Sequence, residues 1–195
     1  MPETLEIPRY TTRYIEALAY AAELFAHQAR KGSADVPYLA HLLAVSALVW
    51  EDGGDEDEAI AALLHDAAED QGGQATLDEI QRRFGSRVAD LVAGCSDTFV
   101  EPKPPWRARK EAHLQHLELA DNGLCRITAA DKLHNVRSIL TAAMTPGVDV
   151  FAPFKGRRDG TIWYYEQMAD ILGRKLPESV SVQLLQAAVL ALAVL

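Results

Sequence analysis

Apolar residues recur at steps of three and four along most of this chain, which is the spacing that places them on one face of an α-helix. The first such stretch, residues 14–25, predicts a helix that begins at Thr11 or Thr12, because either hydroxyl can cap the first turn. We expect this helix to end near Lys31, since the sequence GSADVP follows and supplies helix-breaking residues.

The same periodicity predicts further helices. They cover about residues 38–50, 59–70, 87–95, 106–119, 124–144, 161–172 and 178–195. One more helix is expected after Gly73, where Thr76 and Glu79 have the spacing of a capping box. The sequence contains no internal repeat and no strand-like alternation longer than four or five residues. The predicted fold class is therefore all-α, a compact single-domain bundle of about eight or nine helices.

Composition narrows the class of protein. Of the 195 residues, 49% are hydrophobic and 24% are charged, which are values of a globular protein, so disorder is excluded as the overall state. The net charge of −9 argues against a non-specific nucleic-acid binder, because such proteins rely on a basic surface. A local basic pocket on an acidic protein can still bind an anionic small molecule.

Targeting signals are not evident. Cys95 and Cys125 lack the spacing of a zinc site, and reduced thiols in the cytosol are the simplest interpretation. The first residues, MPETLEIPRY, lack the features of a signal peptide. The apolar C-terminus is shorter than the ~20 residues that span a bilayer, so we expect a buried helix or a dimer face there. We predict a cytoplasmic protein with no membrane or nucleic-acid partner, and a homo-oligomer is left open.

One short segment carries several chemically active side chains. In the sequence LLHDAAED, His65 and Glu69 are four residues apart, and so are Asp66 and Asp70, so a continuous helix would carry them together. Three carboxylates on one packed turn repel one another and lose hydration, and a cation would relieve both costs. The alternative is a solvated acidic helix end.

Two distant segments add residues that can bind a metal. His41 lies in the first turn of an apolar helix, and Asp131 lies in another apolar helix with Asn135 on the same face. With His65 and Asp66 they offer two nitrogen and two oxygen ligands, a set that suits Mn, Fe or Zn better than Ca. A six-coordinate ion with four protein ligands keeps positions open for water and substrate, as catalytic metal sites do.

The order of these residues resembles the HD superfamily of metal-dependent phosphohydrolases. A longer series of motifs resembles the hydrolase half of the RelA/SpoT proteins, and in particular the small alarmone hydrolases, which include the metazoan SpoT homologue. The motifs are RK at 30–31, PYxxH at 37–41, LHDxxED at 64–70, TLDEI at 76–80 with FG at 84–85, and ADKLxNxR at 130–137. The resemblance predicts a single HD-type hydrolase domain over residues 1–195, with a core over about 10–172 and an apolar C-terminal helix over 178–195.

The resemblance also implies a role for each matching residue. The implied metal ligands are His41, His65, Asp66 and Asp131, and the family's ion is Mn²⁺, with Fe²⁺ or Zn²⁺ as alternatives. The implied catalytic residues are Glu69 and Asp70, which match the acidic pair that activates water. The implied substrate-binding residues are Arg30, Lys31, Asn135 and Tyr164. The family reaction removes pyrophosphate from the 3′ position of guanosine tetra- or pentaphosphate.

Several alternatives stay open. The substrate can be the adenosine counterpart or another nucleotide, as for a 5′-nucleotidase or a deoxynucleotide triphosphohydrolase, and a non-catalytic nucleotide-binding scaffold is a third class. The bases at 103–110 and 155–158 either bind phosphate or lie solvated on loops. His134 is expected to support the ligands or lie at the surface, and Cys95 and Cys125 are expected to be inert core thiols. The remaining histidines, His27, His113 and His116, are expected to be structural.

Overall fold

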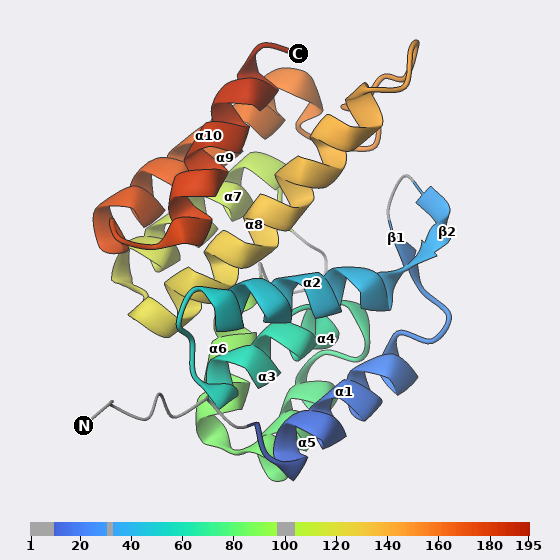
Figure 1. Ribbon diagram of the computed structural model, residues 1–195, viewed down its shortest axis with the longest axis vertical. Helices are drawn as coiled ribbons and strands as arrows, with labels where there is room; N and C mark the ends of the chain where they lie inside the picture. Colours follow the sequence, from blue (N-terminus) through green and yellow to red (C-terminus); the bar gives the residue numbers. More distant parts are fainter. Residues whose placement is uncertain (1–9, 31–32, 97–103) are drawn as a thin grey trace, which may run out of the picture.

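The computed structural model describes residues 10–30, 33–96 and 104–195, and their regular structure is almost entirely helical (Figure 1). The helices are α1 (Thr12–Leu24), α2 (Tyr38–Glu51), α3 (Glu56–Leu64), α4 (Ala67–Asp70), α5 (Gln74–Phe84), α6 (Ser86–Cys95), α7 (Trp106–Leu119), α8 (Asn122–Ala143), α9 (Arg157–Lys175) and α10 (Val180–Ala193). Two short strands, β1 (Ala29–Arg30) and β2 (Ser33–Pro37), form an antiparallel hairpin between α1 and α2. The predicted all-α class is confirmed.

Helix α8 connects the two parts of the hydrophobic core. Its residues Leu124, Ile127 and Ala130 pack into a core built with α1–α6, which are the blue and green helices of Figure 1. Its residues Leu133 and Val136 pack into a second core built with α7, α9 and α10. A 22-residue helix that is buried along both halves has little freedom to move. Side chains near its middle are therefore held in fixed positions.

Helix α3 is buried along nearly its whole length. Every residue from Glu58 to Leu64 is buried, and burying each of Ile60, Leu63 and Leu64 contributes roughly 1.5–3 kcal/mol. We expected this helix to continue to Asp70, and that expectation is wrong, because α3 ends at Leu64 and a separate turn, α4, begins at Ala67. The chain turns at His65 and Asp66, and the core continues beyond the turn with the buried residues Ala67 and Ala68.

Of the two helix caps predicted from the sequence, the one at α5 is wrong and the one at α1 is confirmed. The expected box of Thr76 and Glu79 is wrong, because α5 begins at Gln74 and Thr76 instead donates its hydroxyl hydrogen to the carbonyl of Gln71 at 3.0 Å. Gly73, at φ +61°, makes the sharp turn at the start of this helix and stands at the cap position three residues before Thr76. A capping box is found at α3, where Asp55 and Glu58 cap each other's backbone amides. Thr11 caps α1 as predicted.

The β1–β2 hairpin replaces the predicted end of the first helix. Helix α1 ends at Leu24 rather than near Lys31, and the chain then forms the pairs Ala29–Pro37 and Arg30–Ser33. The backbone amide of Tyr38 donates to the carbonyl of Gln28 at 2.8 Å, which connects the hairpin to the first turn of α2. The hairpin therefore holds Arg30 beside the start of α2, where His41 lies.

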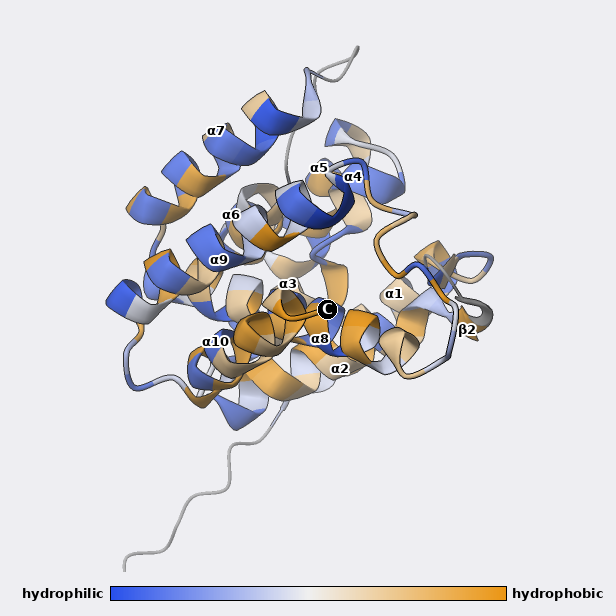
Figure 2. Ribbon diagram, turned by 90° about the horizontal axis from the view of Figure 1, so that it is seen from above, coloured by the Kyte–Doolittle hydropathy of each residue, from blue (hydrophilic) through white to orange (hydrophobic). Residues whose placement is uncertain are grey.

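The C-terminal helix packs on α8 and α9. Its first turn is held by Asp52 of the α2–α3 loop, which accepts hydrogen bonds from the Ser179 hydroxyl at 2.5 Å and from the Ser181 amide at 3.2 Å. In Figure 2, α2 and α10 are coloured mostly as hydrophobic and α7 mostly as hydrophilic. Within the part of the chain that the structure describes, no helix combines the length and apolar character needed to cross a membrane.

Candidate metal centre

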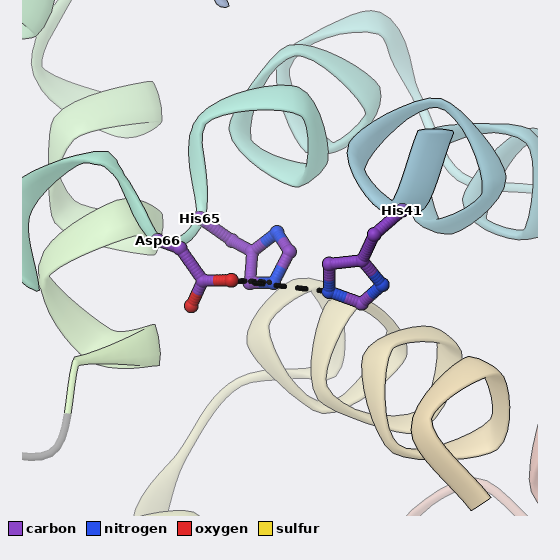
Figure 3. Close-up of side chains that lie close together, drawn as sticks. All are labelled: His41, His65 and Asp66. Atoms are coloured by element: carbon purple, nitrogen blue, oxygen red, sulfur yellow. Dashed lines mark ion pairs between the residues drawn. The ribbon is translucent and has the colours of Figure 1, made fainter. Parts of the chain in front are cut away.

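Four side chains from three separate segments meet at one point. His41 comes from the first turn of α2, His65 and Asp66 from the turn between α3 and α4, and Asp131 from the middle of α8. The His41 Nε2 atom lies 3.2 Å from Asp131 Oδ1 and 3.8 Å from Asp66 Oδ2. The His65 Nε2 atom lies 2.9 Å from Asp66 Oδ2 and 3.6 Å from Asp131 Oδ1. Figure 3 shows the two imidazoles and the Asp66 carboxylate turned toward one another.

The chain leaves helix α3 at His65. Helix α3 ends at Leu64, and Asp66 adopts φ −96° and ψ −2° in the turn that precedes α4. His65 and Asp66, two adjacent residues of this turn, both contribute to the cluster.

The donor atoms fit a divalent cation. His41 and His65 are 1% and 3% exposed, and the Nε2 atom of each has no hydrogen-bond partner despite the nearby carboxylates. A buried polar atom without a partner costs about 1–3 kcal/mol, which an ion between the four groups would offset. Ligand atoms of His41, His65 and Asp66 all lie within 4.8 Å of one another. Two imidazole nitrogens facing two carboxylate oxygens form a ligand set suited to a first-row divalent metal.

Both imidazoles are oriented through their other ring nitrogen. The His65 Nδ1 atom lies 2.8 Å from the carbonyl oxygen of Ala62, which can only accept, so Nδ1 carries the proton. The Nε2 atom of His65 is then the one that faces the carboxylates. The His41 Nδ1 atom lies 2.9 Å from Nδ1 of His134. Burial and the neighbouring His41 lower the pKa of His134 to about 4, so this imidazole is neutral near pH 7.

Opposite charges set the protonation of the cluster. Burial alone would lower the pKa of His65, but Asp66 and Asp131 raise it to about 10. Burial alone would raise the pKa of Asp66, but His65 brings it down to about 2. Burial would also raise the pKa of Asp131, yet Lys132 and the two histidines hold it well below its ordinary value. Positive charge is therefore favoured at this point, and a divalent cation bound there would supply it.

Further hydrogen bonds fix the carboxylates in place. The Tyr38 hydroxyl donates to Asp66 Oδ2 at 2.5 Å. The Lys132 ammonium donates to Asp131 Oδ2 at 2.5 Å, and the Asn135 amide donates to Asp131 Oδ1 at 2.6 Å. Sequence reasoning assigned no role to Tyr38 or Lys132, although both stand in the motifs that carry the ligands. Their closeness in sequence to His41 and Asp131 was the available signal.

Arg30 and Asn135, both expected to bind substrate, lie together at the edge of the cluster. The Arg30 guanidinium donates to Asn135 Oδ1 at 2.7 Å and lies 5.5 Å from the ring centre of Tyr38. Because Asn135 also donates to Asp131, it connects Arg30 to the candidate ligands. Lys31 lies outside the described residues, as does Lys103, so the structure says nothing about either side chain.

Glu69 and Asp70, the expected catalytic pair, lie on α4 after the turn. The expectation that they share one helical face with His65 and Asp66 is wrong, because the helix is interrupted between them. Asp70 Oδ2 accepts a hydrogen bond from the Gln28 amide at 2.9 Å, and Glu69 is half-buried. Both therefore lie on the segment that directly follows the candidate ligands, and their catalytic roles stay predictions.

Tyr164 is part of the interface between α7 and α9. Its side chain is buried, its hydroxyl lies 2.9 Å from Nδ1 of His113, and the Lys110 ammonium lies 4.6 Å from the centre of its ring. His113 and His116 also line a cavity of about 740 Å³ between α6 and α7. The substrate-binding role of Tyr164 stays a prediction. Nearby, Arg107 stacks 3.3 Å from the ring centre of Trp163 and pairs with Glu111 at 2.7 Å.

The resemblance to the HD superfamily predicts an all-α bundle in which His41, His65, Asp66 and Asp131 lie close together, and the structure has this arrangement. The HD domain family matches residues 17–162. The chain belongs to this family, among relatives of the MESH1 and SpoT type.

Three relatives illustrate the relationship. The chain is 35% identical to guanosine-3′,5′-bis(diphosphate) 3′-pyrophosphohydrolase MESH1 of Xenopus tropicalis over 127 residues, which are 64% of this chain and 68% of that protein. It is 33% identical to human MESH1 over the same shares of the two chains. It is also 33% identical to the bifunctional (p)ppGpp synthase/hydrolase SpoT of Escherichia coli, covering 62% of this chain but 17% of SpoT.

Solved structures share the fold. A structure described as a metazoan orthologue of SpoT that hydrolyses ppGpp aligns with a TM-score of 0.76 and 24% identity, covering 95% of this chain and 97% of the other. The protein lmo0812 of Listeria monocytogenes aligns with a TM-score of 0.69 and 26% identity, covering 80% of this chain and 99% of the other. The chain therefore shares its overall helical fold with these two proteins.

Proposed function

We propose that this protein removes pyrophosphate from the 3′ position of guanosine tetra- and pentaphosphate, with Mn²⁺ held by His41, His65, Asp66 and Asp131. The observation that carries the proposal is the pair of buried imidazole Nε2 atoms that face two carboxylates without hydrogen-bond partners. The names of the relatives support the choice of reaction, because MESH1 and SpoT are both named for this substrate class.

The chain's own residues divide the chemical work. A divalent cation at the cluster would act as a Lewis acid and lower the pKa of water. Glu69 or Asp70 then accepts the proton that the attacking water loses, because both follow the ligands directly on α4. Water adds to the phosphorus attached to the 3′ oxygen, the bond between that phosphorus and the 3′ oxygen breaks, and the 3′ oxygen leaves as a hydroxyl with the proton that the carboxylate had accepted. The products are intact pyrophosphate and the nucleoside 5′-diphosphate from the tetraphosphate, or the 5′-triphosphate from the pentaphosphate.

Binding of the substrate falls to residues around the cluster. Arg30 is held at the edge of the cluster by Asn135, and its guanidinium can neutralise charge on the pyrophosphoryl group as that group is transferred to water. We assign the same task to Lys31, and assign Asn135 and Tyr164 to holding the nucleotide. Neutralising charge that develops as the bond breaks lowers the barrier more than uniform binding does.

The setting proposed for this reaction is the cytoplasm, with a purine nucleotide as partner and with neither nucleic acid nor membrane involved. The two cysteines support it, because Cys95 and Cys125 are both free thiols, as in a reducing compartment. A homo-oligomer stays open.

The test is a product analysis with purified, metal-stripped protein. Guanosine and adenosine 3′-pyrophosphates, nucleoside monophosphates and deoxynucleoside triphosphates are each incubated with and without Mn²⁺. Mn²⁺-dependent release of pyrophosphate from the guanosine compound supports the proposal. Preference for the adenosine compound would replace guanine by adenine as the nucleobase of the substrate. Release of 5′-phosphate or of triphosphate would contradict the proposed 3′-pyrophosphohydrolase reaction. When the cluster variants Asp66→Ala and Asp131→Ala are assayed in the same way, Asp90→Asn is their matched control, because it removes the carboxylate of an exposed residue of α6 that lies outside the cluster.

A further inference from the structure

His134 contacts a candidate histidine ligand and has no role in the proposed function. It lies on α8 three residues after Asp131, and its Nδ1 atom is 2.9 Å from Nδ1 of His41. The two ring centres are 4.9 Å apart, and the planes are tilted by 43°. His134 is half-buried, whereas His41 is 1% exposed. The contact therefore joins the buried ligand to a residue at the edge of the site.

The chemistry of imidazole makes this contact informative. A neutral imidazole has one nitrogen that donates and one that accepts, so His41 can offer a lone pair at Nε2 only when its proton is on Nδ1. A proton on Nδ1 of a buried ring needs an acceptor. Nδ1 of His134 is at the right distance to accept it, with the proton of His134 on its own Nε2.

We infer that His134 is a positioning residue that selects the metal-binding tautomer of His41 and fixes the orientation of its ring. The inference rests on the proposed metal centre. It places His134 in the same relation to His41 that the Ala62 carbonyl has to His65, whose Nδ1 proton it accepts at 2.8 Å. Each candidate histidine ligand then has one partner that orients it, and partners of this kind typically contribute 10–100-fold to metal affinity.

A pair of substitutions separates this role from a merely structural one. His134→Leu fills a similar volume and offers no acceptor. His134→Asn carries its amide on Cγ, the atom to which Nδ1 is attached in histidine, so its carbonyl oxygen can take over the accepting role. His116→Leu is the matched control, because it removes an exposed histidine from α7. Because His134 is half-buried, we expect all three variants to fold, and their melting temperatures check this.

The readout is the Mn²⁺ dissociation constant, measured from the electron paramagnetic resonance signal of free Mn²⁺ without substrate. We expect His134→Leu to weaken Mn²⁺ binding by roughly 10–100-fold, and His134→Asn and His116→Leu to bind as the parent does. Equal Mn²⁺ affinity of His134→Leu and the parent would overturn the inference, as would a His134→Asn variant that is folded yet binds Mn²⁺ as weakly as His134→Leu.

The Mn²⁺-binding experiment on His134 and the hydrolysis assay of the parent protein can give opposite results, so each tests its own claim. A parent protein whose Mn²⁺ affinity depends on His134 but which releases no pyrophosphate would contradict the function and leave this inference standing. Release of pyrophosphate by the parent, together with an unchanged Mn²⁺ affinity in His134→Leu, would support the function and contradict this inference.

Discussion

The His41 Nε2 atom lies 3.2 Å from Asp131 Oδ1, although the two residues belong to α2 and α8, which are far apart in the sequence. The packing of α2 against α8 brings them together, and the turn after α3 adds His65 and Asp66. The candidate metal centre is therefore a product of the fold as a whole.

The two aspartates of the cluster should respond differently to removal. Asp66→Ala and Asp131→Ala should both abolish metal binding and turnover. Asp131→Ala should destabilise the fold more than Asp66→Ala does, by about 3–5 kcal/mol relative to the parent, because it leaves the mostly buried Lys132 ammonium without its carboxylate partner. Metal content and urea unfolding of the metal-free proteins measure the two effects.

The double variant Asp131→Ala/Lys132→Met provides the control for this difference. It should regain stability, since no unpaired charge is left, and still bind no metal. Stoichiometric metal in either single aspartate variant would show that the ligand set is wrong.

Glu69 and Asp70 can be separated by amide substitutions. Glu69→Gln should keep the metal and slow hydrolysis by about 10²-fold or more, because an amide cannot accept the proton of the attacking water. Steady-state kinetics at saturating Mn²⁺ measures the loss. An unchanged kcat in Glu69→Gln would move the role to Asp70, for which Asp70→Asn is the corresponding test.

The contact between α3 and α8 near Gly123 should be sensitive to a single methyl group. A Cβ atom at Gly123 would lie 2.8 Å from Glu58 Oε1, and Glu58 is buried and paired with Arg126. Gly123→Ala should therefore destabilise the protein by about 1–3 kcal/mol through overpacking. Thr141→Ala, at an exposed position of the same helix, is the control. Equal urea midpoints for the two variants would show that this contact is less tight than described.

The two thiols should be poorly reactive in the folded protein. Burial raises the pKa of Cys125 to about 11 and also raises the pKa of Cys95 above its ordinary value. The thiolate is the nucleophile, so at pH 8 both residues should alkylate more slowly than a free cysteine. Mass spectrometry after iodoacetamide treatment, with and without denaturant, checks this. Rapid labelling of the native protein would contradict the described burial.

Sequence patterns predicted the parts of this structure that depend on periodicity and on residue type. The three-and-four spacing of apolar residues indicated the helices, and the helix predicted at 106–119 coincides with α7 (Trp106–Leu119). The candidate ligands could be named because His and Asp stand out in apolar segments. That His41 and Asp131 would lie 3.2 Å apart could not be calculated from spacing, since it depends on how α2 packs on α8.

The missed features depend on tertiary contacts or on single backbone angles. The break at His65–Asp66 interrupts a stretch with good helical periodicity, because the tertiary contacts of these two side chains in the cluster outweigh local preference. The β1–β2 hairpin was missed because β1 has only two residues, too few to show alternation. Gly73 at φ +61° moved the start of α5 ahead of Thr76, and no residue pattern specifies that angle.

The central claim is that His41, His65, Asp66 and Asp131 bind one divalent cation. A crystal soaked in Mn²⁺, with diffraction recorded at the manganese absorption edge, tests it most directly. The account predicts one strong anomalous peak within coordination distance of both Nε2 atoms and of one oxygen from each carboxylate. A peak elsewhere, or ordered crystals in which these four side chains enclose no manganese at saturating concentration, would contradict it.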